Sequence, residues 1–276
     1  MALERAIKTL AVIISLAITT GAAGAGSSEG QSEVAAAPPA PPPYSWKVNV
    51  GLSLIYLKSS AKTLTFAGTA AVERKIPDWI FLIKAGGAYG TSQLPGGADS
   101  QVVALAASLQ ARIDRKFSDL ISVYVLGGIE TDHVQSLRAR EYGEGGISAT
   151  WVDVKEADYS KTYFRNDLGF RYQNDSRHQY YPTEMDLPNV ELVAPRIGAV
   201  FRYAFAKGTV FSEEAEVLPN LSGDARVLVN STTKLTAALT GALSFATSYL
   251  VKYDSAPAPG KVNTETALTV GLEVAF

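Results

Sequence analysis

The sequence predicts an all-β protein, a transmembrane antiparallel β-barrel of about twelve strands. Apolar and polar residues alternate in long segments from Trp46 to Phe276. Successive side chains of a strand point to opposite faces, so each segment has one apolar and one polar face. The segments exceed the roughly 5–6 residues of soluble strands and cover the ~9–11 residues that cross a bilayer at a tilt. Every backbone group inside a bilayer must be paired, so the sheet has to close on itself.

The composition excludes several classes of protein. The 276 residues carry 25 Lys and Arg against 27 Asp and Glu, a formal net charge of −2, so no nucleic-acid partner is expected. Cysteine is absent and only two histidines are present, so we expect no disulfide, no metal site and no cofactor. Hydrophobic residues reach 47 % and charged residues only 19 %, below the roughly 25 % of soluble domains. A large apolar surface must therefore be hidden from water.

Two segments precede the predicted barrel. Residues 1–25 combine a basic start, the short apolar run 10–18 and the small residues Ala23-Gly24-Ala25, which is typical of a cleaved secretory signal peptide. The alternative is an uncleaved anchor, but the apolar run is shorter than the ~20 residues that a spanning helix needs. Residues 26–45 are rich in Pro and Ala without periodicity, which predicts a disordered periplasmic linker. The barrel is expected over residues 46–276.

Twelve segments carry the strand pattern. Two fit poorly, because 137–152 is rich in Gly and because Glu213 in 208–218 is off the pattern, which a β-bulge would explain. The predicted strands are 46–58, 62–75, 79–91, 100–115, 119–134, 137–152, 161–174, 194–206, 208–218, 224–238, 241–253 and 263–276.

The connections predict an orientation. Bacterial barrels have an even strand number, short periplasmic turns and longer outer loops. With a periplasmic N-terminus the turns are 76–78, 116–118, 153–160, Lys207 and 239–240. The outer set is then 59–61, 92–99, 135–136, 175–193, 219–223 and 254–262, which contains most of the long connections, with 153–160 as the exception.

Aromatic residues are expected at the two membrane interfaces. Trp46, Trp79 and Trp151 fall at the periplasmic ends of their strands, and Tyr56, Tyr89, Tyr172 and Tyr253 fall at the outer ends, with Phe276 closing the last strand. Two aromatic girdles are typical of a membrane barrel. A soluble β-sandwich or a lipocalin-like barrel is the alternative, but it needs neither strands of this length nor aromatics sorted to two levels.

The last part of the chain resembles a known family. The stretch Tyr253–Gly260, running on to the terminal Phe276, and a first strand with Trp46 and Gly51 resemble the YdiY-like family, often called salt-induced outer-membrane protein. The chain departs from that family at Lys58–Lys62, where a turn rich in Gly and Asn is frequent. The resemblance implies a Gram-negative outer-membrane barrel of unknown function.

The final strand has a second feature. Its ending Val270-x-Leu272-x-Val274-x-Phe276 is similar to the signal that the barrel-assembly machinery recognises, and it is equally what a lipid-facing strand needs. The expected partners are therefore outer-membrane lipid and that machinery.

Charged residues on the polar face are expected to line the lumen. Placing a basic residue against lipid at mid-depth costs ~2–4 kcal/mol, so these side chains must point inward. Together with Glu73, the predicted lumen-lining residues are Lys84, Arg112, Asp114, Glu130, Arg165, Asp167, Arg171, Arg196, Arg202, Glu214, Glu216, Arg226, Lys234, Lys252 and Glu273.

Two uses of these charges compete. The lumen is either a narrow passage for small solutes or ions, with Arg165, Arg171, Arg196, Arg202 and Arg226 favouring anions, or a structural barrel plugged by ion pairs. The expected role is an envelope protein, as such a passage or as a component of the salt or osmotic response. Adhesion or binding through 175–193 is a further alternative.

Catalysis is the least favoured function. Asp132, His133, Ser136 and His178 could suggest an outer-membrane hydrolase, because a nucleophile needs a base within hydrogen-bond reach. A strand places Asp132 and His133 on opposite faces, which is unsuitable for a dyad. We therefore expect no enzymatic activity and no catalytic residue.

Overall fold

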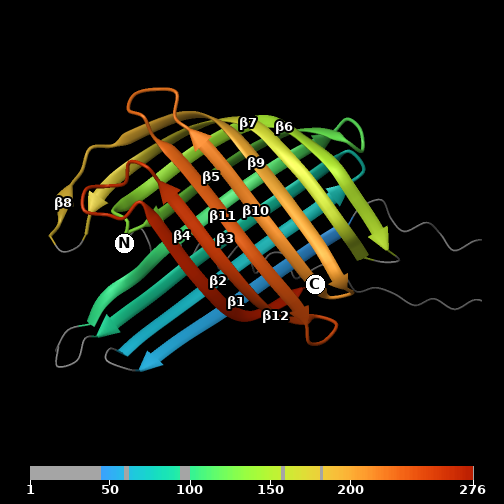
Figure 1. The fold of residues 1–276 in the computed structure, drawn as a ribbon, viewed down its shortest axis with the longest axis horizontal. Coiled ribbons are helices and arrows are strands. Elements are labelled where there is room, and N and C mark those ends of the chain that lie inside the picture. The colour runs from blue at the N-terminus through green and yellow to red at the C-terminus, as the bar shows by residue number, and fades with distance from the viewer. Residues whose placement is uncertain (1–44, 59–61, 94–99, 157–158, 181–182, 276) are drawn as a thin grey trace, which may run out of the picture. The chain divides into compact units, whose positions relative to one another are not determined.

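The computed structural model describes residues 45–58, 62–93, 100–156, 159–180 and 183–275 (Figure 1). The predicted signal peptide, 1–25, and the predicted linker, 26–45, lie outside the described residues, except that Ser45 begins the first strand. Among the described residues, no helix is long and apolar enough to cross a membrane.

The described chain is built of strands. They are β1 (Ser45–Lys58), β2 (Lys62–Ile76), β3 (Trp79–Gln93), β4 (Ser100–Lys116), β5 (Ile121–Asp132), β6 (Leu137–Glu156), β7 (Tyr159–Gln179), β8 (Met185–Asp186), β9 (Val190–Ala206), β10 (Thr209–Pro219), β11 (Val227–Ala238), β12 (Leu243–Asp254) and β13 (Thr264–Ala275).

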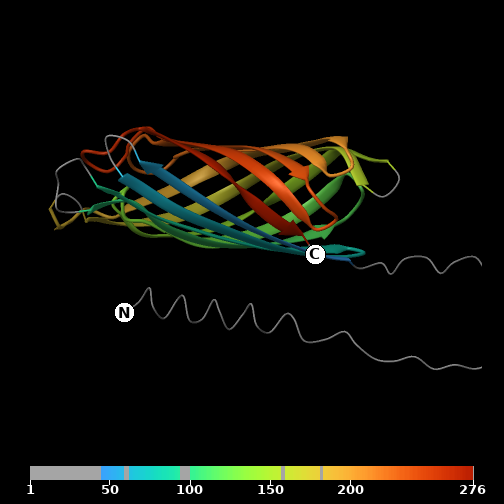
Figure 2. The ribbon, with the colours of Figure 1, turned by 90° about the horizontal axis from the view of Figure 1, so that it is seen from below.

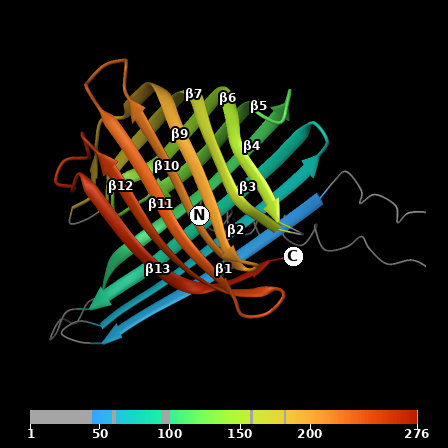
Figure 3. The same cartoon turned by 45° about the vertical axis from the view of Figure 1, so that its right-hand side comes forward.

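Twelve of these strands close into an antiparallel barrel. Each long strand pairs with the next long strand along the chain, β7 pairs with β9, and β1 pairs with β13 to complete the ring. The two-residue β8 only extends the outer end of β7. The strands run obliquely to the barrel axis (Figures 2 and 3). This confirms the predicted fold class and strand number.

The longest hairpin differs from its prediction. The expected turn 153–160 is wrong, since β6 runs to Glu156 and β7 starts at Tyr159. The expected loop 175–193 is likewise shorter, because β7 continues to Gln179 and β9 starts at Val190. A hairpin that projects beyond the apolar band has water on both faces, so its sequence loses the alternation that marks a strand. Only two residues separate β6 from β7, so this connection is short, as expected for the turns at this end of the barrel.

The bulge expected at Glu213 is also wrong. The pairing of β10 with β9 is regular from Val210 to Val217, and the register shifts between Thr209 and Val210 instead. Glu213 therefore lies on the outer face. Its carboxylate accepts hydrogen bonds from Ser231 Oγ at 2.6 Å and from Thr233 Oγ1, both of β11. Hydroxyls on the neighbouring strand thus satisfy an off-pattern carboxylate without any extra residue.

The barrel is apolar outside and polar inside. Leu52, Val125 and Leu168 are 60 % or more exposed, whereas Arg112, Asp167 and Asp175 are 5 % or less exposed. This distribution is the reverse of that in a soluble domain, where charged groups are almost never fully buried unless paired. It is what a sheet needs when lipid contacts its outer face.

The interface aromatics lie on the outer face. Trp46, Trp79 and Trp151 are exposed at the end where the short turns lie, and Tyr89, Tyr172 and Tyr253 are exposed toward the other end. The side chain of Tyr56 and all of Phe276 lie outside the described residues.

Candidate functional site

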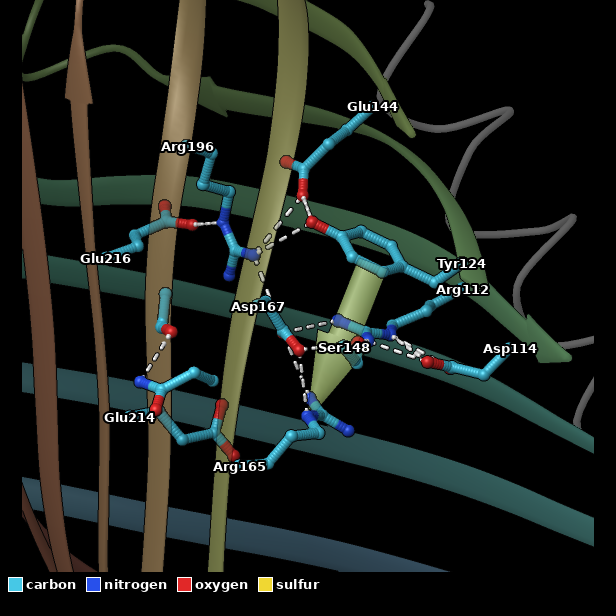
Figure 4. A network of polar contacts seen from close by, with 12 residues as sticks. Arg112, Asp114, Tyr124, Glu144, Ser148, Arg165, Asp167, Arg196, Glu214 and Glu216 are labelled. Atoms are coloured by element: carbon cyan, nitrogen blue, oxygen red, sulfur yellow. Dashed lines mark hydrogen bonds and ion pairs between the residues drawn. The ribbon is translucent and has the colours of Figure 1, made fainter. Parts of the chain in front are cut away.

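A central network of polar side chains lines one wall of the interior (Figure 4). It comes from strands β4 to β7, β9 and β10, whose inward residues face one another. The members of the central network are Arg112, Asp114, Tyr124, Glu144, Ser148, Arg165, Asp167, Arg171, Arg196 and Glu216.

Asp167 is the most connected member. Its carboxylate accepts hydrogen bonds from Arg112 Nη1 at 2.7 Å, from Ser148 Oγ at 2.7 Å and from Arg165 Nη2 at 3.2 Å. Ser148 and Asp167 are direct cross-strand partners, which places both on one face. Arg112 also donates from Nε to Asp114 at 2.9 Å. Asp167 is only 1 % exposed, so its charge depends on these partners and on Arg196, whose Nη1 lies 3.5 Å away.

Two glutamates extend the network toward the outer end. Glu144 accepts hydrogen bonds from Tyr124 Oη at 2.5 Å and from Arg171 Nε at 2.8 Å. Glu216 accepts hydrogen bonds from Arg196 Nε at 2.5 Å and from Arg171 Nη2 at 3.1 Å. Each arginine of this wall therefore contacts at least one carboxylate, and the wall carries little uncompensated charge.

An outer cluster, formed by Glu130, Arg140, Asp175, Arg226 and Asp254, lies near the loop end. Asp175 accepts hydrogen bonds from Arg140 Nε at 2.6 Å and from Arg226 Nη1 at 3.0 Å. Arg140 Nη1 also donates to Glu130 at 2.6 Å, and Arg226 Nε donates to Asp254 at 2.9 Å. The cluster links four strands and narrows the outer mouth.

The loop 255–263 adds to this constriction. Arg177 Nη2 donates to the Ala256 carbonyl at 3.2 Å, and Ala258 is buried. A cavity of only about 80 Å³ lies between this loop and the outer cluster.

The opposite wall leaves a much larger cavity of about 870 Å³. Strands β1 to β4 and β11 to β13 supply mostly Gly, Ala, Ser and Thr there, such as Gly86, Ala88 and Ser108. Four of the charges facing this cavity form two pairs: Lys84 Nζ donates to Glu214 Oε2 at 2.8 Å, and Lys234 donates to Glu273.

The large cavity follows the strands for most of their length. It reaches from Val210 and Ala246, near the short turns, to Glu130 and Lys252, near the loops. Glu130 and Lys252 also line the small cavity, so the two cavities adjoin.

The fifteen predicted lumen-lining residues all lie on the interior. Seven belong to the central network, namely Arg112, Asp114, Arg165, Asp167, Arg171, Arg196 and Glu216. Two, Glu130 and Arg226, belong to the outer cluster. Six, Lys84, Arg202, Glu214, Lys234, Lys252 and Glu273, line the large cavity. Glu73 contacts Lys75 at 3.3 Å.

Several interior residues escaped sequence reasoning. Glu144 and Ser148 lie in the Gly-rich segment that fitted the pattern poorly, and Tyr124 has no charge to mark its face. The alternation of β5 could have placed Tyr124 inside, because it pairs directly with Asp114 of β4. Arg140 lies near a strand end, where the alternation is weak.

The candidate catalytic residues do not assemble a site. Asp132 accepts a hydrogen bond from the Gln135 amide at 3.2 Å, and His178 Nδ1 lies 2.9 Å from Asp186 Oδ1. The Ser136 hydroxyl is buried without a hydrogen-bond partner, so neither histidine ring hydrogen-bonds to it. Among the described residues, no group of three or more His, Asp or Glu side chains could hold a metal ion.

The two histidines instead flank Tyr180 at the outer end. The His133 ring stacks on Tyr180 with centroids 3.9 Å apart, and His178 meets the same ring edge-on at 4.7 Å. Burial lowers the pKa of His133 below its ordinary value, and His178 acts in the same direction, while Asp132 opposes them.

This arrangement predicts a pH-dependent contact. A depressed folded-state pKa means that the fold favours the neutral imidazole, so the stack should be complete above the ordinary pKa of ~6.5 and weaken as the pH falls through the folded-state pKa. An NMR titration of His133 in micelles should give a midpoint below that of a free histidine, with the Tyr180 amide following the same midpoint. His178→Ala should raise the midpoint. A midpoint at or above the ordinary value contradicts this prediction.

The fold and the interior define the class of protein. A closed twelve-strand antiparallel barrel with an apolar outer face and an ion-paired interior is a transmembrane β-barrel. The chain belongs to the family described as protein of unknown function, DUF481, whose model matches residues 50–276. The YdiY-like proteins are part of that family, so the resemblance is confirmed.

The chain was also compared with curated sequences and with solved structures. No curated protein sequence matches the chain. Among solved structures, the NanC porin is 13 % identical, with a TM-score of 0.45 over 83 % of this chain and 99 % of that chain. The KdgM porin is 12 % identical, with a TM-score of 0.39 over 84 % and 99 %. The translocator domain of the autotransporter NalP from Neisseria meningitidis is 11 % identical, with a TM-score of 0.38 over 84 % and 87 %.

Proposed function

We propose that this chain resides in the outer membrane of a Gram-negative envelope and is a narrow passage for small solutes and ions. The observation that carries the proposal is the cavity of about 870 Å³ beside the central network, which follows the strands from near the short turns to near the loops. A fully plugged barrel would have ion pairs on both walls, whereas here one wall is built of small side chains.

The ion pairs argue for weak charge selectivity. Arg165, Arg171 and Arg196 would favour anions if they were free, but each contacts a carboxylate. Two of the lysines on the large cavity, Lys84 and Lys234, are paired as well, while Lys252 faces it near the outer end without an ion pair to another described residue. The passage is therefore limited by size, at the outer cluster and the loop 255–263, rather than selected by charge.

The proposal predicts a measurable conductance that a bulky side chain reduces. Ala88 lines the large cavity on β3, so Ala88→Trp should lower single-channel conductance in planar bilayers to less than half of the wild-type value. Ala111 is exposed on the outer face of β4, one residue from the inward Arg112, so Ala111→Trp is a matched control that should leave conductance unchanged. Inserted wild-type barrels without conductance would support the plugged scaffold instead.

We also propose that the barrel-assembly machinery recognises β13. Among the described residues, five residue pairs between β1 and β13 close the ring, against nine or more between all other neighbouring barrel strands. A last strand with so few partners in the ring presents the longest free edge for recognition. Deletion of residues 270–276 should abolish insertion into membranes while synthesis continues.

A further inference from the structure

The seam between β1 and β13 is closed along only part of its length. The paired residues run from Asn49 with Ala275 to Ser53 with Gly271. Beyond Ser53, β1 continues to Lys58 in pairing with β2, and β13 continues back to Thr264 in pairing with β12. These stretches of β1 and β13 do not pair with each other. The seam is therefore parted toward the loop end, on the side of the barrel seen in Figure 2.

The parted seam adjoins the large cavity. Ser53 and Gly271, the last pair before the two strands part, both line this cavity. Leu52 and Leu272, the pair before them, line it as well. The cavity therefore extends to the point where β1 and β13 part.

The surface behind the parted seam suits a hydrocarbon chain. Ser53, at the last seam pair, lies beside Ala67 of β2, which lies beside Ala88 of β3 and then Ala106 of β4. All four side chains are small, and all four line the large cavity. The path from the seam inward along this row meets no charged side chain.

The energetics favour a chain that comes from the membrane. Unpaired strand edges are costly in hydrocarbon, so the parted stretch is tolerated only where it borders a cavity. An alkyl chain that leaves lipid for this row contacts small, uncharged side chains, while the paired charges of Lys84 and Lys234 lie on other parts of the cavity. The Trp side chains lie at the opposite end, which places the parted stretch in the outer leaflet.

We propose that the parted β1–β13 seam is a lateral opening that admits the acyl chain of an outer-leaflet lipid into the large cavity. The chain lies along Ser53, Ala67, Ala88 and Ala106. This binding site goes beyond the proposed passage: it shares the large cavity with the passage but opens to the membrane.

The test uses phospholipid labelled with a spin probe near the end of its acyl chain. In nanodiscs that contain this lipid, NMR relaxation of alanine methyl groups reports how closely the chain approaches. The interior methyls of Ala88 and Ala106 should relax to within about twofold of the lipid-facing Ala111 methyl. Ala204 is 1 % exposed on the far wall and should stay protected. Interior methyls as protected as Ala204 would overturn the proposal.

A disulfide cross-link across the seam (a seam lock) provides a second test, and the chain has no native cysteine that could form a competing disulfide. Leu54→Cys with Val270→Cys would cross-link the first unpaired position, and Leu52→Cys with Leu272→Cys would cross-link a position that is already paired. The first lock should remove the relaxation at Ala88 while that at Ala111 remains, and the second should change neither. Equal relaxation at Ala88 under both locks would contradict lateral entry. The first lock should also raise conductance, because it excludes a chain that occupies the cavity at Ala88, whereas barrels without conductance under either lock would contradict the passage alone.

Discussion

Replacing Asp167 by Ala is expected to destabilise the barrel by about 3–5 kcal/mol, the usual cost of removing one partner from a buried ion pair. Asp167 accepts hydrogen bonds from Arg112, Ser148 and Arg165 and is 1 % exposed. Its removal takes away the carboxylate that pairs with Arg165 and one of the two carboxylates that pair with Arg112. Urea-dependent unfolding in detergent micelles or thin bilayers, followed by Trp fluorescence, measures the loss.

The control keeps the residue type and changes the environment. Asp153 is exposed on the projecting β6–β7 hairpin and accepts one hydrogen bond from Ser160, so Asp153→Ala should change the free energy of unfolding by less than ~1 kcal/mol. The double variant Arg112→Ala, Asp167→Ala should cost less than the sum of its single variants, because it removes a charge together with its counter-charge. Strict additivity would show that the pair is not coupled and would contradict the role given to Asp167.

The fold was predictable because one physical condition acts on every strand. Lipid outside and water inside impose alternation on all residues within the membrane, and Trp46, Trp79 and Trp151 mark one interface. The prediction failed at two places where this condition does not decide the residue type. Glu156 pairs with Tyr159 in a hairpin outside the apolar band. Glu213 is an outward carboxylate that accepts hydrogen bonds from hydroxyls of the neighbouring strand.

The site was predictable in part, for a related reason. Parity along a strand says which residues face inward, and the interior positions of Arg112 and Asp167 follow from it. Parity says nothing about which residues meet across the lumen. Arg112 and Asp167 are 55 positions apart, and their contact depends on strand order and stagger, which are set by the whole ring. For this reason an anion-favouring arginine wall and a neutral, ion-paired wall could not be told apart from the sequence.

The central network also depends on a close approach of two strands beneath an aromatic ring. Gly146 of β6 pairs with Gly169 of β7, and Tyr124 of β5 extends across both glycines to donate to Glu144. A Cβ atom on Gly146 would lie 2.3 Å from the Leu168 carbonyl oxygen and 2.9 Å from Tyr124 Oη. The first of these is a backbone atom, so no side-chain rotation relieves the contact.

Gly146→Ala is therefore expected to destabilise the barrel by ~1–3 kcal/mol, the range for one added carbon in a well-packed interior. Gly143, on the same strand, has nothing within 4 Å of an added Cβ, so Gly143→Ala is the matched control and should be close to neutral. The added Cβ pushes Tyr124 away from Glu144 and so breaks their hydrogen bond. Tyr124→Phe already lacks this hydrogen bond. Gly146→Ala should therefore lower the free energy of unfolding less in the Tyr124→Phe background than in the wild type. If Gly146→Ala lowered the free energy of unfolding as little as Gly143→Ala, the close approach of β6 and β7 would not be needed for the hydrogen bond between Tyr124 and Glu144. The proposed role of this contact in positioning the network would then be wrong.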